Sequence, residues 1–422
     1  MIKVTLYLIL LAMTTLIHGY DRLTGESFAS RSEVIGQNGM VATSHPLATQ
    51  IGLDVLKNGG NAIDAAIAAN IALGLMEPTG NGIGGDLFAI VWSAKDKKLY
   101  GLNASGPAPK DISIDYFKSK GLKKIPSFGP LPVSVPGAVD GWIKLNDRFG
   151  NTDFENLFEP TIKYAQEGFP VTETIAYYFE RSKSRYLDFP NFKETWMQSG
   201  DTPKKGEIFK NLDLAKTLEE ISKTKRKSFY EGRLAKEISR FIKDQGGFLS
   251  FEDMSNYQSE WVEPVSSNYR GYDVWELPPN GQGIAALQIL NILEGFDLKS
   301  MGLNSAEYVH HFVEAKKIAF ADRAKYSADP KFNNINIEYL ISKEYAELRR
   351  REINASKASQ TDSAGVLKNG DTIYLTTADK DGNMVSLIQS NYRGMGSGMI
   401  PNNLGFMLQD RGELFSLNPD HA

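Results

Sequence analysis

Residues 369–390 read NGDTIYLTTADKDGNMVSLIQS, a stretch that predicts a β-hairpin entered from a polar loop. Its two runs 372–378 and 384–390 are rich in Thr, Ile, Tyr, Val and Leu, which favour strands. Between them, Asp381-Gly382 is a strong signal for a turn. These residues therefore predict two strands that pair with each other.

If the pairing is symmetric about Asp381, Thr372 and Ser390 face each other, within one register step. A hydroxyl is a weak nucleophile unless a base takes its proton, and one known solution uses the residue's own α-amino group. A free α-amino group has a pKa of roughly 7.7 to 8.0, so it acts as a base near neutral pH. Freeing the amine of Thr372 requires a cut after Asp371. Because threonine is also a common strand former, the hairpin alone leaves a purely structural Thr372 open.

The stretch from Thr372 to Gly398 resembles the small-subunit start of the γ-glutamyltransferases (γ-glutamyl transpeptidases), which are N-terminal nucleophile hydrolases. The resemblance covers nearly the whole chain, because further blocks are similar to family blocks in family order. These blocks are 42–48 (ATSHPLA), 59–66 (GGNAIDAA), 77–86 (EPTGNGIGGD), 133–137 (VSVPG), 277–283 (LPPNGQG), 314–317 (EAKK) and 321–323 (ADR). Several independent blocks in one order are more specific than any single motif.

The resemblance implies an α/β fold, the four-layer αββα sandwich of the N-terminal nucleophile hydrolases. In that fold a large and a small subunit from one precursor contribute strands to one core. It implies a large-subunit region over 20–371 and a small-subunit region over 372–422 that begins at the nucleophile. Because family small subunits extend well beyond this length, we expect a chain truncated at its C-terminus and an incomplete sandwich.

Hydrophobic periodicity independently predicts a mixed α/β fold. Leu47, Ile51 and Val55 recur at helical spacing, and the run 61–76 is apolar on nearly every face, which indicates a buried helix. We expect helices over 46–57, 61–76 and 306–323, a central strand covered on both faces over 87–92, and a further strand over 269–276.

Residues 80–85, GNGIGG, lie between an expected helix and an expected strand. This is the reverse of the strand-loop-helix order that dinucleotide and phosphate sites need. We therefore expect these glycines to allow close backbone packing near the cleft.

The composition is that of an ordinary soluble globular chain, 41% hydrophobic and 23% charged. A net charge of −4 argues against broad electrostatic binding to nucleic acid. The chain has no cysteine, which excludes disulfides, cysteine nucleophiles and thiolate metal sites. Its five histidines show no ligand-like spacing, so we predict no catalytic metal and no cofactor.

The N-terminus predicts export. Met1-Ile2-Lys3 and the apolar run 4–17 have the form of a secretory signal, and the run is too short to span a bilayer. We expect a signal peptide over 1–19 and a periplasmic or secreted protein. Because Ile17-His18-Gly19 lacks the small-x-small cleavage pattern, a buried N-terminal element in a cytoplasmic protein remains the alternative.

The resemblance also implies a mechanism in two stages. Thr372 Oγ attacks the carbonyl of Asp371, and hydrolysis of the resulting ester exposes Thr372 as a new N-terminus. The same oxygen then attacks a substrate amide, and the acyl-enzyme is released by water or by the amine of an amino acid or peptide. Ser390 occupies the position of the family's helper hydroxyl. Its alternative role is that of a strand-end hydroxyl satisfied locally.

Two positions in the expected substrate pocket depart from the family. In the γ-glutamyltransferases an arginine three residues before an Ala-Pro pair holds the substrate α-carboxylate, and Ser105 stands at that place. A bidentate charged clamp is therefore missing. Tyr392 lies two residues past Ser390, where relatives often have asparagine.

The family's paired acids, which hold the substrate α-amino group, align with Glu413-Leu414, so the second acid is absent. Arg411 and Glu413 could take over part of the recognition. We expect γ-glutamyl compounds such as glutathione as substrates. The alternatives are an acyl group without the amino-acid head, as in cephalosporin- or glutaryl-acylase-like members, and an inactive exported family member that binds small amino-acid derivatives.

Overall fold

The computed structural model describes residues 33–333, 335–360, 372–419 and 421. Asp371 and the expected signal peptide over 1–19 lie outside the described residues. The chain forms two units, Met1–Gln37 and Asn38–Ala422. Of the first unit, only the exposed irregular residues 33–37 are described, so the architecture below is that of the second unit.

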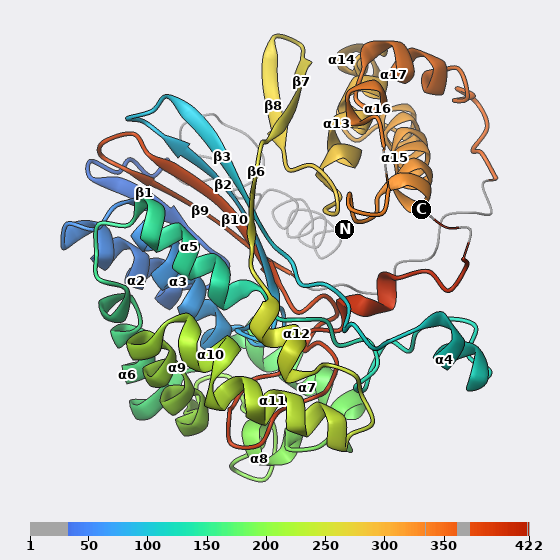
Figure 1. Cartoon of the computed structure of the whole chain (residues 1–422). Coiled ribbons are helices and arrows are strands. Elements are labelled where there is room, and N and C mark those ends of the chain that lie inside the picture. Colours follow the sequence, from blue (N-terminus) through green and yellow to red (C-terminus); the bar gives the residue numbers. More distant parts are fainter. Residues whose placement is uncertain (1–32, 334, 361–371, 420, 422) are drawn as a thin grey trace, which may run out of the picture. The chain divides into compact units, whose positions relative to one another are not determined.

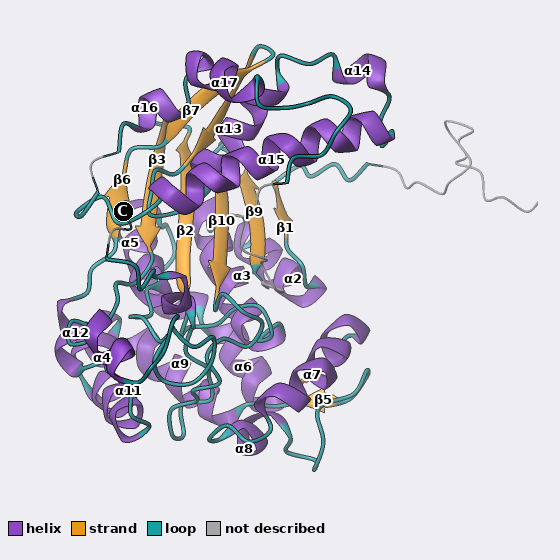
Figure 2. Cartoon of the chain, turned by 90° about the vertical axis from the view of Figure 1, so that its right-hand side faces the viewer, coloured by secondary structure: helices purple, strands orange, loops and turns teal. Residues whose placement is uncertain are grey.

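One six-stranded sheet forms the centre of this unit, and all five of its strand pairs are antiparallel. Its strands, in spatial order, are β1 (Gly39–Ala42), β9 (Ile373–Asp379), β10 (Met384–Ser390), β2 (Asp86–Ser93), β3 (Lys98–Ala104) and β6 (Glu260–Val262). Figure 2 shows them side by side in this order. Strands from both sides of the expected cut therefore interleave in one sheet.

The predicted hairpin and its register are confirmed. β9 and β10 pair so that Ile373 lies opposite Gln389, a register symmetric about Asp381. The next step of the same register places Thr372 opposite Ser390. Gly382 in the turn adopts a φ of 86°, a conformation that favours glycine.

Helices α2 (Pro46–Lys57), α3 (Ala62–Met76) and α5 (Ala138–Phe149) cover one face of the sheet (Figure 1). The helix predicted over 46–57 is confirmed at both ends. The second helix starts one residue later than predicted, because Asn61 is its N-cap and forms a capping box with Asp64. Almost every residue of α3 is buried, as its apolar composition predicts.

β2 is central in the sheet, as predicted, but the prediction that both its faces are covered is wrong for the described residues. Leu87, Ala89 and Val91 are fully buried against the helices, whereas Phe88 and Ile90 on the opposite face are half-buried. A run that is apolar at every position does not reveal how far each face is covered. The same face of the sheet also carries three exposed side chains, those of Tyr374, Met384 and Ile388.

The remaining helices below the sheet extend the same hydrophobic core. They are η1 (Phe154–Leu157), α6 (Glu159–Glu167), α7 (Glu173–Tyr186), α8 (Phe192–Trp196), α9 (Leu212–Thr224), α10 (Arg226–Glu231), α11 (Arg233–Asp244) and α12 (Phe251–Asn256), with the short pair β4 (Phe169–Pro170) and β5 (Ile208–Phe209). The short helix α4 (Ile114–Ser119) buries Phe117 outside this core. None of the described helices combines the length and the apolar character needed to cross a membrane.

A second group of elements follows β6 along the chain and has its own small core (Figure 1). It contains β7 (Val265–Tyr269), β8 (Tyr272–Glu276), α13 (Gly283–Leu293), α14 (Leu298–Met301), α15 (Ala306–Tyr326), α16 (Ile337–Leu340) and α17 (Lys343–Arg350). The helix predicted over 306–323 is confirmed and runs three residues further. The strand predicted over 269–276 is confirmed over 272–276, but its start is wrong, because Arg270 and Gly271 turn the chain with φ values of 51° and 93°.

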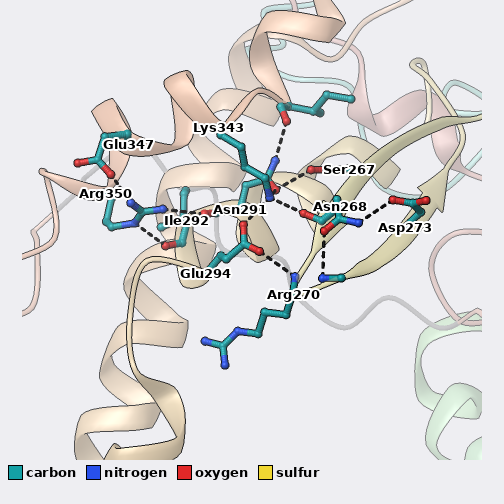
Figure 3. Close-up of polar contacts among 12 residues, drawn as sticks. Ser267, Asn268, Arg270, Asp273, Asn291, Ile292, Glu294, Lys343, Glu347 and Arg350 are labelled. Atoms are coloured by element: carbon teal, nitrogen blue, oxygen red, sulfur yellow. Dashed lines mark hydrogen bonds and ion pairs between the residues drawn. The ribbon is translucent and has the colours of Figure 1, made fainter.

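A polar network ties the β7–β8 hairpin to helices α13 and α17 (Figure 3). Lys343 Nζ donates to Asn291 Oδ1 at 2.6 Å, to Glu294 Oε2 at 2.5 Å and to the carbonyl of Asn268. Arg350 donates to the carbonyl of Asn291 at 2.9 Å. The network therefore joins the turn end of the hairpin to the C-terminal end of α13 and to α17.

Candidate active site

Thr372 and Ser390 place two hydroxyl groups at one end of the β9–β10 hairpin. The oxygens Thr372 Oγ1 and Ser390 Oγ lie 3.0 Å apart, which is hydrogen-bond distance. Thr372 is exposed, while Ser390 is buried and its Oγ accepts the backbone N–H of Tyr392 at 2.7 Å. The pair therefore joins an accessible hydroxyl to one whose position is fixed.

Residues 80–85, here called the glycine loop, pack directly against this pair, as the sequence predicts. A Cβ on Gly85 would lie 2.3 Å from the carbonyl oxygen of Ser390, and one on Gly84 would lie 2.2 Å from that of Met407. The carbonyl of Gly80 accepts the N–H of Asn391 at 3.3 Å. Only residues without a side chain allow these three segments to meet so closely.

A buried ion pair lies beside Ser390, and it joins the predicted site residue Arg411 to Asp86, which the sequence does not predict as a site residue. Asp86, the first residue of β2, is 2% exposed and pairs with Nε of Arg411, in the short helix η2 (Arg411–Leu414). Asp86 is also the sheet partner of Ser390. Burial raises the pKa of Asp86, while the charge and hydrogen bond of Arg411 oppose that rise. The sequence feature that could have identified Asp86 is its place directly after the glycine pair Gly84-Gly85.

Tyr392 lies between two arginines. Its φ is 79°, a conformation unusual for a non-glycine residue. The guanidinium carbons of Arg411 and Arg393 lie 5.0 Å and 5.2 Å from the centre of its ring. Burial raises the pKa of the Tyr392 hydroxyl, and the positive charge of Arg393 opposes the rise.

Glu413 has its carboxylate engaged inside the protein. It forms an ion pair with Arg393, in which the two side chains are 11% and 14% exposed, and Arg393 Nη2 lies 3.0 Å from Glu413 Oε1. The same oxygen accepts the hydroxyl of Ser127 at 2.8 Å. Leu414, at the position of the family's second acid, is 43% exposed. The carboxylate is therefore occupied by its own neighbours.

Ser105 lies in an amide and hydroxyl cluster at the edge of the sheet. Its Oγ donates to Asn103 Oδ1 at 2.7 Å and accepts from Asn280 Nδ2 at 3.0 Å. Its carbonyl accepts the hydroxyl of Tyr257 at 2.9 Å. Burial raises the pKa of Tyr257 well above its ordinary value, and the nearby charge of Asp86 contributes to the rise. Ser105 is thus joined to the Asp86 side of the site through Tyr257.

Asp410 is a second buried acid near the nucleophile pair. It is 0% exposed, its Oδ1 accepts the N–H of Arg393 at 3.1 Å, and its own N–H donates to the carbonyl of Asn391 at 3.2 Å. Burial raises the pKa of Asp410 well above its usual range. Burial therefore favours the protonated form of this carboxyl group.

Arg323, near the end of α15, adds a further cation. Burial lowers the pKa of Arg323, and repulsion from Arg411 adds to that effect. The carbonyl of the adjacent Ala324 contacts Nε2 of His421 at 2.7 Å, so the last turn of α15 reaches the chain that follows η2. Within the described ranges, no cluster of three or more His, Cys, Asp or Glu side chains is arranged to hold a metal ion.

Comparisons with known proteins agree on one family. The family model described as Gamma-glutamyltranspeptidase matches residues 48–422. The glutathione hydrolase-like YwrD proenzyme of Bacillus subtilis (strain 168) is 38% identical over 390 residues, which is 92% of this chain and 73% of the relative. The glutathione hydrolase proenzyme of the same strain is 32% identical over 99% of this chain and 75% of its own length.

The structural comparison leads to the same group. The crystal structure of a cephalosporin acylase from Bacillus halodurans matches with a TM-score of 0.86 and 44% identity, covering 96% of this chain and 75% of the acylase. The predicted α/β fold class, the αββα sandwich of the N-terminal nucleophile hydrolases, is confirmed by this likeness together with the layers described above.

Proposed function

The chain belongs to the gamma-glutamyltranspeptidase family of N-terminal nucleophile hydrolases, and from that premise we propose that it cuts itself between Asp371 and Thr372 and then uses Thr372 as its nucleophile. The observation that carries this proposal is the 3.0 Å contact between Thr372 Oγ1 and Ser390 Oγ. In this proposal, residues 20–371 form the large subunit and residues from 372 onward begin the small one.

Self-cleavage starts with attack of Thr372 Oγ1 on the carbonyl carbon of Asp371. The bond between that carbon and the nitrogen of Thr372 breaks, and the nitrogen takes up the proton that the hydroxyl loses. Water then hydrolyses the ester, which leaves a carboxyl group on Asp371 and a free amine and hydroxyl on Thr372. Ser390 Oγ lies within hydrogen-bond distance of the attacking oxygen.

Turnover uses the newly freed amine as the base. It takes the proton of Thr372 Oγ1 as this oxygen attacks a substrate amide, and the proton then passes to the departing amine. The acyl group remains on Thr372 as an ester. Water releases it as a carboxylic acid, or the amine of an amino acid or peptide accepts it as a new amide. Ser390 is the helper hydroxyl in both stages.

For the acyl group, we propose first a γ-glutamyl compound such as glutathione. The names of the two relatives, a glutathione hydrolase and a glutathione hydrolase-like proenzyme, support this choice. A second candidate is an acyl group that has a carboxylate but no amino group, as a glutaryl group has. It is favoured by Ser105, by the commitment of Glu413 to Arg393, and by the likeness to a cephalosporin acylase.

Self-cleavage is tested with purified protein and its Thr372→Ala variant. We expect the parent to yield a heavy chain ending at Asp371 and a light chain starting with Thr372, identified by mass spectrometry, and the variant to remain whole. Thr376→Ala, on the same strand, is the matched control and should be cut normally. Equal cutting of the Thr372→Ala variant at that bond would refute the proposal.

Substrate choice is tested with two chromogenic amides, γ-glutamyl-p-nitroanilide and glutaryl-p-nitroanilide. A higher kcat/KM for the γ-glutamyl amide supports the first candidate, and a higher value for the glutaryl amide supports the second. Addition of a dipeptide acceptor separates transfer from hydrolysis, because transfer produces a new amide that chromatography detects.

We also propose that residues 1–19 direct export, so that the enzyme works in the periplasm or outside the cell. The support is the charged start and apolar run of this segment. N-terminal sequencing of protein from each cell fraction tests this. A cytoplasmic protein that retains Met1 would contradict it.

A further inference from the structure

In the ion pair between Asp86 and Arg411, the carboxylate approaches the guanidinium group from one edge. Asp86 contacts Arg411 at Nε, which is one edge of the planar guanidinium group. In the part of the chain that the structure describes, Nε of Arg411 is buried, and the two terminal NH₂ groups form no hydrogen bond. The Arg411 side chain is 29% exposed, whereas that of Asp86 is 2% exposed. One edge of the guanidinium is therefore held inside, and the opposite edge is accessible.

The position of Asp86 links this pair to the nucleophile. Asp86 and Ser390 are direct partners in the sheet, and the backbone N–H of Ser390 hydrogen-bonds the Asp86 carboxylate. Arg411 in turn lies against the ring of Tyr392, whose N–H holds the hydroxyl of Ser390. Both routes from Asp86 reach Ser390, and Ser390 contacts Thr372.

A buried carboxylate is costly to retain unless it is well paired, and removing one partner of such a pair is strongly destabilising. Well-packed apolar residues would stabilise this place at least as well. The pair has instead the arrangement of a carboxylate receptor, because a guanidinium held at one edge presents two parallel N–H groups at the other. The glycine loop brings this receptor beside Ser390.

We propose that Asp86 is a positioning residue, which holds Arg411 by its Nε edge so that its terminal NH₂ groups receive a carboxylate on the substrate's acyl group. This inference rests on the proposed function and adds the residue that sets its substrate class. A γ-glutamyl group and a glutaryl group both carry such a carboxylate, and a butyryl group does not. Arg393 does not compete for the role, since Glu413 already neutralises it.

The test is the preference for glutaryl-p-nitroanilide over butyryl-p-nitroanilide, measured as the ratio of their kcat/KM values. We expect Asp86→Asn and Arg411→Gln each to lower this ratio about tenfold or more. The double variant should lower it no further than the worse single variant, because the two residues act as one unit. Using a ratio removes any general effect on Ser390, since such an effect changes both substrates alike.

Two further variants sharpen the result. Arg411→Lys keeps the charge but lacks the planar fork, and we expect it to lose the preference as Arg411→Gln does. Asp140→Asn breaks another buried Asp–Arg pair, with Arg226, and is the matched control that should leave the ratio unchanged. An unchanged ratio in Asp86→Asn or Arg411→Lys, or independent multiplying losses in the double variant, would overturn the inference.

A binding measurement keeps the inference separate from turnover. In the Thr372→Ala background, glutaramate should raise the melting temperature while butyramide, which lacks the carboxylate, should not. The added Asp86→Asn change should abolish the shift. Suppose that glutaramate stabilises the Thr372→Ala protein as expected, but the parent neither cuts itself nor turns over amides. The proposed function then fails, while the proposal that Asp86 and Arg411 bind a carboxylate is supported. Equal shifts with and without Asp86 refute the receptor alone.

Discussion

Thr372 Oγ1 and Ser390 Oγ lie 3.0 Å apart although the two residues are 18 positions apart in the sequence. The β9–β10 register brings them together, and the N–H of Tyr392 fixes the inner hydroxyl at 2.7 Å. The outer hydroxyl is accessible and the inner one is not. This asymmetry fits the different tasks proposed for them, attack for Thr372 and orientation for Ser390.

Replacing Ser390 by alanine should slow both self-cleavage and amide turnover by about tenfold or more, because the attacking oxygen loses its hydrogen-bond partner. Gel electrophoresis over time and the release of p-nitroaniline measure the two rates. Ser390→Thr keeps the hydroxyl and should retain most activity. Ser386→Ala is the control on the same strand, since the Ser386 hydroxyl lies 2.9 Å from that of Tyr374 on the opposite, more exposed face of the sheet. Wild-type rates in Ser390→Ala would remove Ser390 from the mechanism.

A methyl group at Gly85 should displace the backbone of Ser390 and, with it, the Ser390 hydroxyl. Its Cβ would lie 2.3 Å from the Ser390 carbonyl oxygen, so the strand ends have to separate. We expect Gly85→Ala to lose roughly 1–3 kcal/mol of stability and most of its activity. Gly74→Ala, within α3, is the control, because its Cβ would meet nothing closer than 3.5 Å. Equal melting temperatures and rates for both variants would contradict this account.

The sequence predicts those parts of the fold in which local pattern and turn chemistry determine the answer. The Asp381-Gly382 turn sets the hairpin register, and helical spacing predicts both ends of α2 correctly. Of the strand expected over 269–276, residues 272–276 form β8, whereas its start is wrong because Gly271 turns the chain there. That signal is local and could have been found by the same reasoning.

Other features depend on contacts between distant positions and leave no pattern in one sequence. Asp86 and Arg411 meet only after the glycine loop and η2 are folded against each other. The pairing of Glu413 with Arg393 is likewise a tertiary event, and it occupies an acid that the sequence offers for substrate binding. Sequence reasoning therefore identifies the candidate nucleophile pair more readily than the pocket around it.

Asp410 should make the protein less stable as the pH rises. Burial raises the pKa of Asp410 in the folded state, so above its ordinary value of about 3.8 the unfolded chain loses a proton that the folded chain keeps. Stability then falls as the pH rises from that value toward the folded pKa. Asp410→Asn, which mimics the protonated acid, should melt higher than the parent at pH 7 and equally below pH of about 3.8.

Thermal unfolding followed by circular dichroism across this pH range checks the prediction for Asp410. Asp381→Asn, in the exposed hairpin turn, is the control and should not change the slope. A variant at Asp410 that melts lower than the parent at pH 7 would show that the charged form is the stabilising one.

Glu314 should have the opposite pH dependence. It is 2% exposed, and its carboxylate accepts from Lys317 Nζ at 2.6 Å and from the N–H of Ser359 at 3.0 Å. Burial alone would raise the pKa of Glu314, but these hydrogen bonds lower it to about 2. Because the folded pKa lies below the ordinary value of about 4.5, the stabilisation is present above that value and is lost as the pH falls toward about 2.

Glu314→Gln should therefore melt lower than the parent at pH 7 and lose less stability between pH of about 5 and 3. Lys317 Nζ also holds the carbonyl of Ser359 at 3.1 Å, so Glu314 and Lys317 together clamp both backbone groups of one residue. Amide hydrogen exchange at Ser359 should consequently speed up in the variant. Glu307→Gln, in the exposed first turn of the same helix, should change neither property. Unchanged exchange at Ser359 in Glu314→Gln would mean that Lys317 alone anchors this part of the chain.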